Sequence, residues 1–149
     1  MTGSQTFPGL TRQVLDEHQQ IHFFLQLLAR SMQNLEPAGT DAEFLRRIAA
    51  QIEGLRERLD EHFAVEEEGG LFRALADLVP ESRSEVQALA SEHGHILEML
   101  EMARIRAEYG PASEGHILRA ELESFLATIG EHERREEALL QRALERETR

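Results

Sequence analysis

The frame His-x-x-x-Glu-Glu occurs twice in this chain, at residues 62–67 and again at residues 132–137. Four residues make about one turn of an α-helix, so the histidine and the first glutamate of each copy would stack on one helix face. An apolar stripe with steps of three and four residues leads into each copy, through Leu45, Ile48, Ile52, Leu55 and Leu59 in the first and through Leu122, Phe125 and Ile129 in the second. Both pairs therefore belong to the face that a helix turns toward a protein core. Because an unpaired carboxylate in a core is strongly unfavourable, the frame predicts a positive partner beside it.

Composition narrows what that partner can be. Of the 149 residues, 41% are hydrophobic and 30% are charged, which suits amphipathic helices with charged outer faces. The formal net charge of −12, with no basic patch to offset it, argues against nucleic acid or an anionic membrane as a partner. The absence of cysteine excludes disulfides, thiolate zinc sites and cysteine-ligated clusters. Any metal must be held by nitrogen and oxygen atoms.

The sequence predicts one domain over residues 10–146, with a flexible tail at 1–9 and a frayed end at 147–149. The first residues lack the basic and apolar regions of a signal peptide, and no apolar run approaches the length of a membrane span. We therefore expect a cytoplasmic protein.

Helical periodicity predicts four long helices and no sheet. Gly69-Gly70 should break the second helix and leave a short continuation before Pro80. The expected spans are 11–35, 40–68 with a continuation at 71–78, 82–109, and 113–146. Capping signals stand at the starts of the last three long helices, namely Thr40 with Glu43, Ser82 with Glu85, and Ser113. Four such helices with short loops should pack as an antiparallel up-down-up-down four-helix bundle, an all-α fold.

The two halves of the chain resemble each other. Asp16-Glu17-His18 corresponds to Ser91-Glu92-His93, as the two His-x-x-x-Glu copies correspond to one another. Each half is a helix with a core histidine followed by a helix with His-x-x-x-Glu, a weak internal repeat that predicts a pseudo-two-fold bundle. The polar residues on core-facing stripes are His18, His22, His62, Glu66, His93, His132 and Glu136.

Imidazole and carboxylate groups without thiolate suit iron, zinc, manganese or copper. The candidate residues would over-supply one metal, whereas two octahedral metals bridged by both carboxylates would use all of them. Two octahedral metals offer twelve coordination positions, of which two bridging carboxylates take four and a bridging oxo or hydroxo group takes two. Five histidines would then leave one position vacant, and four histidines would leave two. His22 therefore decides whether one or two coordination positions are open.

The arrangement resembles the hemerythrin-like, or HHE cation-binding, domain family over residues of about 11–146. The pattern that carries the resemblance is a histidine, a His-x-x-x-Glu pair, a second histidine and a second such pair on successive helices. The resemblance implies a non-haem di-iron centre bridged by Glu66 and Glu136, with terminal ligands His18, His62, His93 and His132. Family members bind dioxygen reversibly, sense oxygen or iron, or handle nitric oxide and peroxide.

Two departures separate this chain from the oxygen-carrying hemerythrins. Those proteins have His-x-x-x-His on the third helix, where this chain has Leu97 in place of the second histidine and instead carries His18-x-x-x-His22 on the first helix. They have His-x-x-x-x-Asp on the fourth helix, whereas here Glu136 has the HHE spacing and Glu137 the longer one, and the apolar stripe favours Glu136. These departures argue against simple oxygen carriage more than against a di-iron site.

Apolar residues are expected to wall the site without offering an acid or a base, which favours binding or redox chemistry over hydrolysis. They are Ile21, Leu25, Phe63, Ile96, Leu97, Leu100, Ile129 and Leu139. We expect the neighbouring acids Glu67, Glu68 and Glu137 to be solvated or to lie just outside the ligand set.

The expected function is the binding or sensing of a small diatomic ligand, dioxygen first, at a di-iron centre. One alternative is an enzyme, a di-iron oxidoreductase that acts on peroxide or nitric oxide, or a protein that donates iron to repair other centres. Another is a metal-free or zinc-loaded structural bundle. The sequence does not indicate an oligomeric state.

Overall fold

A computed structural model describes residues 5–35 and 41–148 of the chain. Its regular structure is entirely helical, and neither described segment contains a strand, so the prediction of an all-α protein is confirmed. The helices are α1 (Phe7–Met32), α2 (Ala42–Glu67), α3 (Leu71–Leu78), α4 (Arg83–Tyr109) and α5 (Gly115–Glu147). None of these described helices combines the length and the apolar composition that a membrane span requires.

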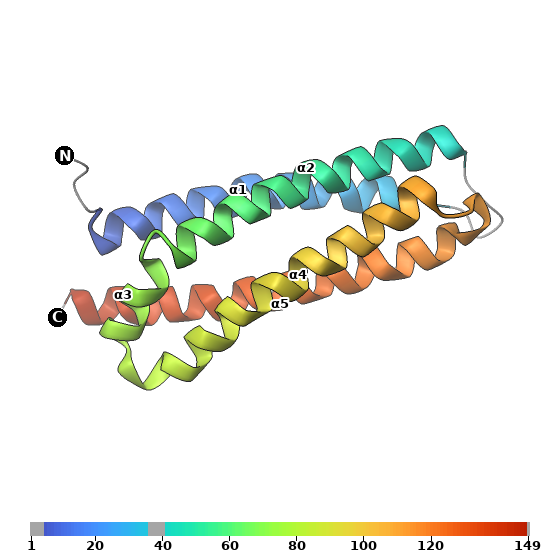
Figure 1. Ribbon diagram of the computed structural model, residues 1–149. Coiled ribbons are helices and arrows are strands. Elements are labelled where there is room, and N and C mark those ends of the chain that lie inside the picture. The colour runs from blue at the N-terminus through green and yellow to red at the C-terminus, as the bar shows by residue number, and fades with distance from the viewer. Residues whose placement is uncertain (1–4, 36–40, 149) are drawn as a thin grey trace.

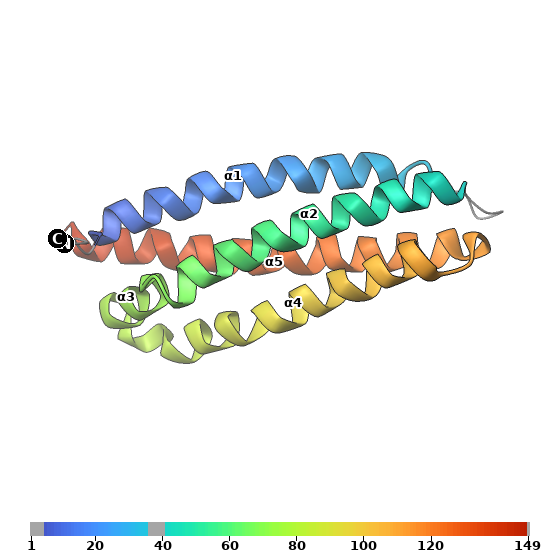
Figure 2. The same ribbon diagram turned by 45° about the horizontal axis from the view of Figure 1, so that its top comes forward.

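The four long helices lie alongside one another in an elongated bundle (Figure 1). The chain runs out along α1 and returns along α2, then runs out along α4 and returns along α5 (Figure 2). Helix α2 packs against α1 and α4, and α5 packs against α4 and α1. The short α3 contacts all four long helices and closes one end of the bundle.

Helix α1 begins at Phe7, inside the segment that the sequence predicts to be a flexible tail. Thr6 caps the helix, because its side chain accepts a hydrogen bond from the Gly9 amide at 3.2 Å. Pro8 suits the first turn, where its missing amide proton is not needed. Residues 1–4 of the predicted tail lie outside the described residues. At the other end of the chain, α5 continues through Glu147 and residue 149 is not described.

The side-chain caps predicted for the later helices are not found among the described residues, although Ser82 does precede α4 as its N-cap residue. Thr40 lies outside the described residues, and the cap of α2 is Asp41, which accepts from the Glu43 amide at 2.9 Å. The predicted box of Ser82 with Glu85 does not form, because the Ser82 hydroxyl ends a 3₁₀ turn and donates to a carbonyl within that turn. Ser113 likewise lies inside a 3₁₀ turn, so α5 begins two residues later.

The break between α2 and α3 falls at the predicted pair of glycines. Gly70 adopts the left-handed conformation, with φ 95° and ψ 2°, which residues with a Cβ rarely adopt. A Cβ added at Gly69 would lie 2.3 Å from the Val65 carbonyl oxygen. Both positions therefore need glycine, and the turn that they make sends α3 across the end of the bundle.

A layer of buried polar side chains crosses the core at one level of the bundle. The apolar residues on its two sides form two separate clusters, one of which gathers around α3. On α1, His18 stands between Val14 of one cluster and Ile21 of the other. On α5, the polar residues stand between Ile129 and Leu139 in the same way. The helix ends and the α3 cap thus bury this layer from both directions.

The strained turn at Gly70 gives the first prediction. Gly70→Ala should destabilise the protein by about 1–2 kcal/mol, because the left-handed conformation is unfavourable for a residue with a Cβ. Gly130→Ala is the control, since Gly130 is exposed within α5 and an added Cβ would meet no atom within 4 Å. It should stabilise the protein by about 0.5–1 kcal/mol. Urea unfolding followed by circular dichroism measures both changes, and effects of the same sign would contradict a strained turn.

Candidate metal centre

Six buried side chains from the four long helices meet in the polar layer. They are His18 from α1, His62 and Glu66 from α2, His93 from α4, and His132 and Glu136 from α5. None of them is more than 4% exposed. These are six of the seven residues that the sequence predicts to be metal ligands.

The two glutamates lie at the centre of the layer, and the Nε2 atom of each histidine faces them. The Nε2 atoms of His62 and His93 lie 3.3 and 3.2 Å from Glu66, and those of His18 and His132 lie 3.3 and 3.6 Å from Glu136. These inward atoms form two groups that share both glutamates, and the atoms of each group lie within 4.8 Å of one another. We call the group with His18 and His62 position one and the group with His93 and His132 position two.

Most of the inward atoms have no hydrogen-bond partner among the residues that the structure describes. The buried atoms without one include both oxygens of Glu66, both oxygens of Glu136, and the Nε2 atoms of His18, His93 and His132. Native proteins leave few buried polar atoms in this state, because each unpaired atom is unfavourable. A metal ion accepts electron pairs from carboxylate oxygen and neutral imidazole nitrogen alike. The donor set therefore fits metal ions that prefer nitrogen and oxygen ligands.

A second ring of glutamates surrounds the histidines. Each Nδ1 atom donates to one carboxylate, His18 to Glu137 (3.1 Å), His62 to Glu17 (2.7 Å), His93 to Glu67 (2.8 Å) and His132 to Glu92 (3.3 Å). We call these four the outer glutamates. A proton held on Nδ1 fixes the tautomer and leaves the Nε2 electron pair directed into the layer. The outer glutamates thus hold the imidazoles in the form that binds metal.

His22 is the one predicted ligand that lies outside both groups. Its side chain is 55% exposed, and its Nε2 atom lies 2.5 Å from Glu133. Ile21 continues the buried face of α1, so its neighbour His22 falls at the edge of that face. Glu133 is buried and belongs to a third, smaller group with His18 and Glu137. It is an acid beside the site that the predicted apolar wall does not include.

Without a metal, protons compensate the buried carboxylates. Burial lowers the pKa of His18, but the facing carboxylates of Glu136 and Glu66 outweigh burial and raise the pKa from 6.5 to about 11. Burial also lowers the pKa values of His62 and His132, but Glu66 and Glu136 respectively outweigh it and raise both. Burial and the nearby Glu66 carboxylate raise the pKa of Glu136. Burial also acts to raise the pKa of Glu66, but its polar neighbours Glu136 and the histidines hold that pKa well below 4.5.

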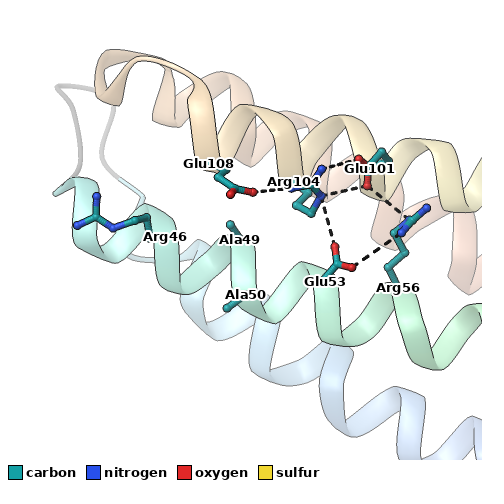
Figure 3. A pocket seen from close by; sticks show the side chains of 8 residues that line it. All are labelled: Arg46, Ala49, Ala50, Glu53, Arg56, Glu101, Arg104 and Glu108. Carbon is teal, nitrogen blue, oxygen red and sulfur yellow. Dashed lines mark hydrogen bonds and ion pairs between the residues drawn. The ribbon is translucent and has the colours of Figure 1, made fainter.

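Another polar region, a surface groove of about 560 Å³ between α2 and α4, lies apart from the layer (Figure 3). Arg104 pairs there with Glu53, Glu101 and Glu108, and Arg56 pairs with Glu53 and Glu101. Each of these charges faces an opposite charge, and all five side chains are partly exposed. This groove is therefore an ion-pair network rather than a site with unsatisfied ligands.

No role is predicted for Glu17 and Glu92 from the sequence, whereas Glu67 and Glu137 are expected to be solvated or to lie just outside the ligand set, and the second of these positions is the one that they occupy. The internal repeat carried a signal for all four, because a glutamate precedes His18 and His93 and a second glutamate ends each His-x-x-x-Glu-Glu frame. Glu17 and Glu92, which each precede a histidine, bond the His-x-x-x-Glu histidine of their own half, His62 and His132 respectively. Glu67 and Glu137, which each end a frame, bond the single histidine of the opposite half, His93 and His18 respectively.

A comparison with protein families finds one whose profile, described as "Hemerythrin HHE cation binding domain", matches residues 9–144. The match covers nearly the whole chain and includes the six residues of the layer and the four outer glutamates. Comparisons with curated proteins and with solved structures gave no match.

Metal uptake should release protons from the layer. In the metal-free protein at pH 7 His18 holds a proton, and a metal ion can bind its Nε2 atom only after that proton leaves. We expect Zn²⁺ uptake in weak buffer to release more than one proton per chain, measured with a pH indicator, and the apparent affinity to rise with pH. His95→Ala changes an exposed histidine and should leave the proton count unchanged. Uptake without proton release would contradict the raised pKa values.

The same protons should stabilise the metal-free fold at neutral pH. A histidine whose pKa is raised in the folded state contributes stability that is complete below 6.5 and is lost as the pH rises toward about 11. We expect the urea midpoint of the metal-free protein to be lower at about pH 10 than at about pH 6.5. The zinc-loaded protein, in which the metal replaces these protons, should lose less stability. An unchanged midpoint for the metal-free protein would be the contrary result.

Proposed function

The chain belongs to the hemerythrin HHE cation-binding domain family, and we propose that it holds two iron ions and binds or senses a small diatomic ligand, dioxygen first, at that pair. One ion would occupy position one and the other position two, with both glutamates shared. The proposed ligands are His18, His62, Glu66, His93, His132 and Glu136.

The observation that carries the proposal is the set of unpartnered atoms in the layer. Four carboxylate oxygens and three imidazole nitrogens are buried without a hydrogen-bond partner among the described residues. Together they come from all four long helices, and both halves of the chain contribute imidazoles and carboxylates. One cation would bind the atoms of one group and leave the Nε2 atoms of the other group's histidines without a partner among the described residues. Two cations satisfy both, which supports a pair of ions bridged by Glu66 and Glu136.

The chain's own residues would orient the ligands and keep water out. Each group offers two imidazole nitrogens and one oxygen from each carboxylate, and the outer glutamates keep the imidazoles turned inward. The ring of Phe63 stacks on His93 with 3.7 Å between centroids, and Ile21, Ile96 and Ile129 are buried in the apolar cluster on one side of the layer. The iron pair would supply electrons and open coordination positions for a small ligand.

The space beside the layer supports a ligand of a few atoms. A cavity of about 70 Å³ reaches His62 between α1 and α2. Such a volume has room for a diatomic molecule or a water molecule. Its lining residues are Glu17, Gln20, Ile21, Arg58, Glu61 and His62.

We also propose that the four long helices form an antiparallel bundle with a pseudo-two-fold axis between Glu66 and Glu136. The hydrogen bonds of the outer glutamates support this, since each bond in one half has a counterpart between the corresponding residues of the other. Under such symmetry the two ions would have the same set of protein ligands.

The surface position of His22 favours a second candidate function. With four histidine ligands, the octahedral count leaves two vacant positions, and equal ligand sets would put one on each ion. Adjacent vacancies suit redox turnover of peroxide or nitric oxide as well as reversible binding. The chain would then be a di-iron oxidoreductase.

Iron loading tests the proposal. Protein expressed with ample iron should contain two irons per chain, and re-exposure to air after anaerobic reduction should change its visible absorption. A reversible change supports ligand binding, whereas turnover of peroxide or nitric oxide supports the second candidate. Iron that stays far below two per chain after reconstitution would rule out both.

A matched pair of variants on α1 tests the ligand set. His18→Ala should lose at least one of the two irons and change the absorption spectrum. His22→Ala, one turn later and exposed, should keep both irons and the parent spectrum. Equal iron loss in the two variants would contradict the proposed ligands.

A further inference from the structure

The two copies of the frame differ in the residues between their histidine and first glutamate. The first copy reads His-Phe-Ala-Val-Glu and the second reads His-Glu-Arg-Arg-Glu. Phe63 of the first copy therefore corresponds to Glu133 of the second, and Val65 corresponds to Arg135. The first copy has apolar side chains at both places, and the second has one negative and one positive charge. The two metal positions consequently differ in what surrounds their equivalent ligands.

Position one is surrounded by three carboxylates. Glu17 and Glu137 accept hydrogen bonds from its two histidines, and Glu133 lies buried in a group with His18. The described residues place no arginine within ion-pair distance of any of the three. Apart from the two ligand histidines, the one ionisable partner of these carboxylates among the described residues is His22, which is 55% exposed and bonds Glu133. The surroundings of position one thus carry a net charge of minus three, or minus two when His22 is protonated.

Position two has fewer negative charges around it. Glu92 accepts a hydrogen bond from His132 and also forms an ion pair with Arg135, so one of the two outer carboxylates is neutralised. Where position one has Glu133 beside His18, position two has the Phe63 ring stacked on His93, with 4° between the ring planes. The net charge of these surroundings is minus one.

Exposed charges near the two positions do not reverse this difference. Asp60 and Glu68 line a hollow over His93, but both are exposed and water screens their charges. Arg58 and Glu61 line the small cavity beside His62 and are opposite in sign. The decisive differences are the buried carboxylate of Glu133 and the arginine bound to Glu92.

We propose that the two metal positions are unequal, with position one binding the first cation and position two filling second and emptying first. The inference rests on the proposed two-metal function. Each additional net negative charge at this range should raise cation affinity by about tenfold or more. Partial loss of metal would leave a one-metal form in which position one is filled.

Titration of the metal-free 149-residue chain with Co²⁺ tests the inference. Mutual repulsion of the two ions would separate the binding steps even for equal positions, so the location of the first ion is the deciding measurement. Crystals grown with one equivalent of Co²⁺ should show anomalous scattering at position one in at least about tenfold excess over position two. Equal occupancy, or the first ion at position two, would overturn the inference.

Charge variants assign the difference to its cause. Arg135→Gln should tighten the second Co²⁺ step severalfold, and Glu133→Gln should weaken the first, as followed by visible absorption and calorimetry. Arg134→Gln is the matched control, since Arg134 is 76% exposed and pairs only with Glu131 among the described residues. Circular dichroism of each metal-free variant verifies that it folds. A response to Arg135→Gln no larger than that of the control would overturn the assignment.

The same titration separates this inference from the proposed function. Uptake of fewer than two Co²⁺ ions per chain would contradict the two-metal centre itself, and the inference with it. Uptake of two ions with equal occupancy at one equivalent would leave the two-metal centre intact and overturn only the inequality.

Discussion

Two carboxylates, Glu66 and Glu136, lie buried in the middle of the bundle, and none of their four oxygens has a hydrogen-bond partner. Two such groups side by side are tolerated only with positive charge next to them. Four imidazole rings supply or attract that charge. In the metal-free protein the protonated imidazoles compensate the charge of the carboxylates. In the metal-loaded protein neutral imidazoles would bind metal ions, and these ions would compensate that charge. The histidines, their outer partners and the helices that carry them all serve this requirement.

The polar layer also organises the core of the bundle. It separates an apolar cluster in the long arm of the bundle from a second cluster around α3. Because α3 contacts all four long helices, it closes the short end that the layer would otherwise leave near solvent. The turn at Gly69 and Gly70 that positions α3 follows directly after the Glu66-Glu67 pair. Burial of the layer therefore depends on a backbone conformation a few residues away from its ligands.

The two halves of the internal repeat supply equivalent ligands to the site but different charges around those ligands. Corresponding residues of the two halves supply the inward atoms and the outer glutamates, which gives both metal positions the same ligands. Glu133 and Arg135 have no charged counterparts in the first frame, so the surroundings differ in charge while the ligands do not. A symmetric ligand set with asymmetric surroundings can hold two like ions with different affinities.

The sequence by itself determined the helices, the break at Gly70 and the six residues of the layer, because helical periodicity decides which side chains share a face. It did not decide His22, which has the same spacing from His18 as Glu66 has from His62. The rotation of α1 against its neighbours places His22 at the surface, and helix rotation is set by packing between elements. The sequence also did not decide which histidine each outer glutamate bonds, since each bond joins two helices and depends on their relative height. Only the tertiary structure fixes such distances, whereas a repeating pattern along one helix fixes only its faces.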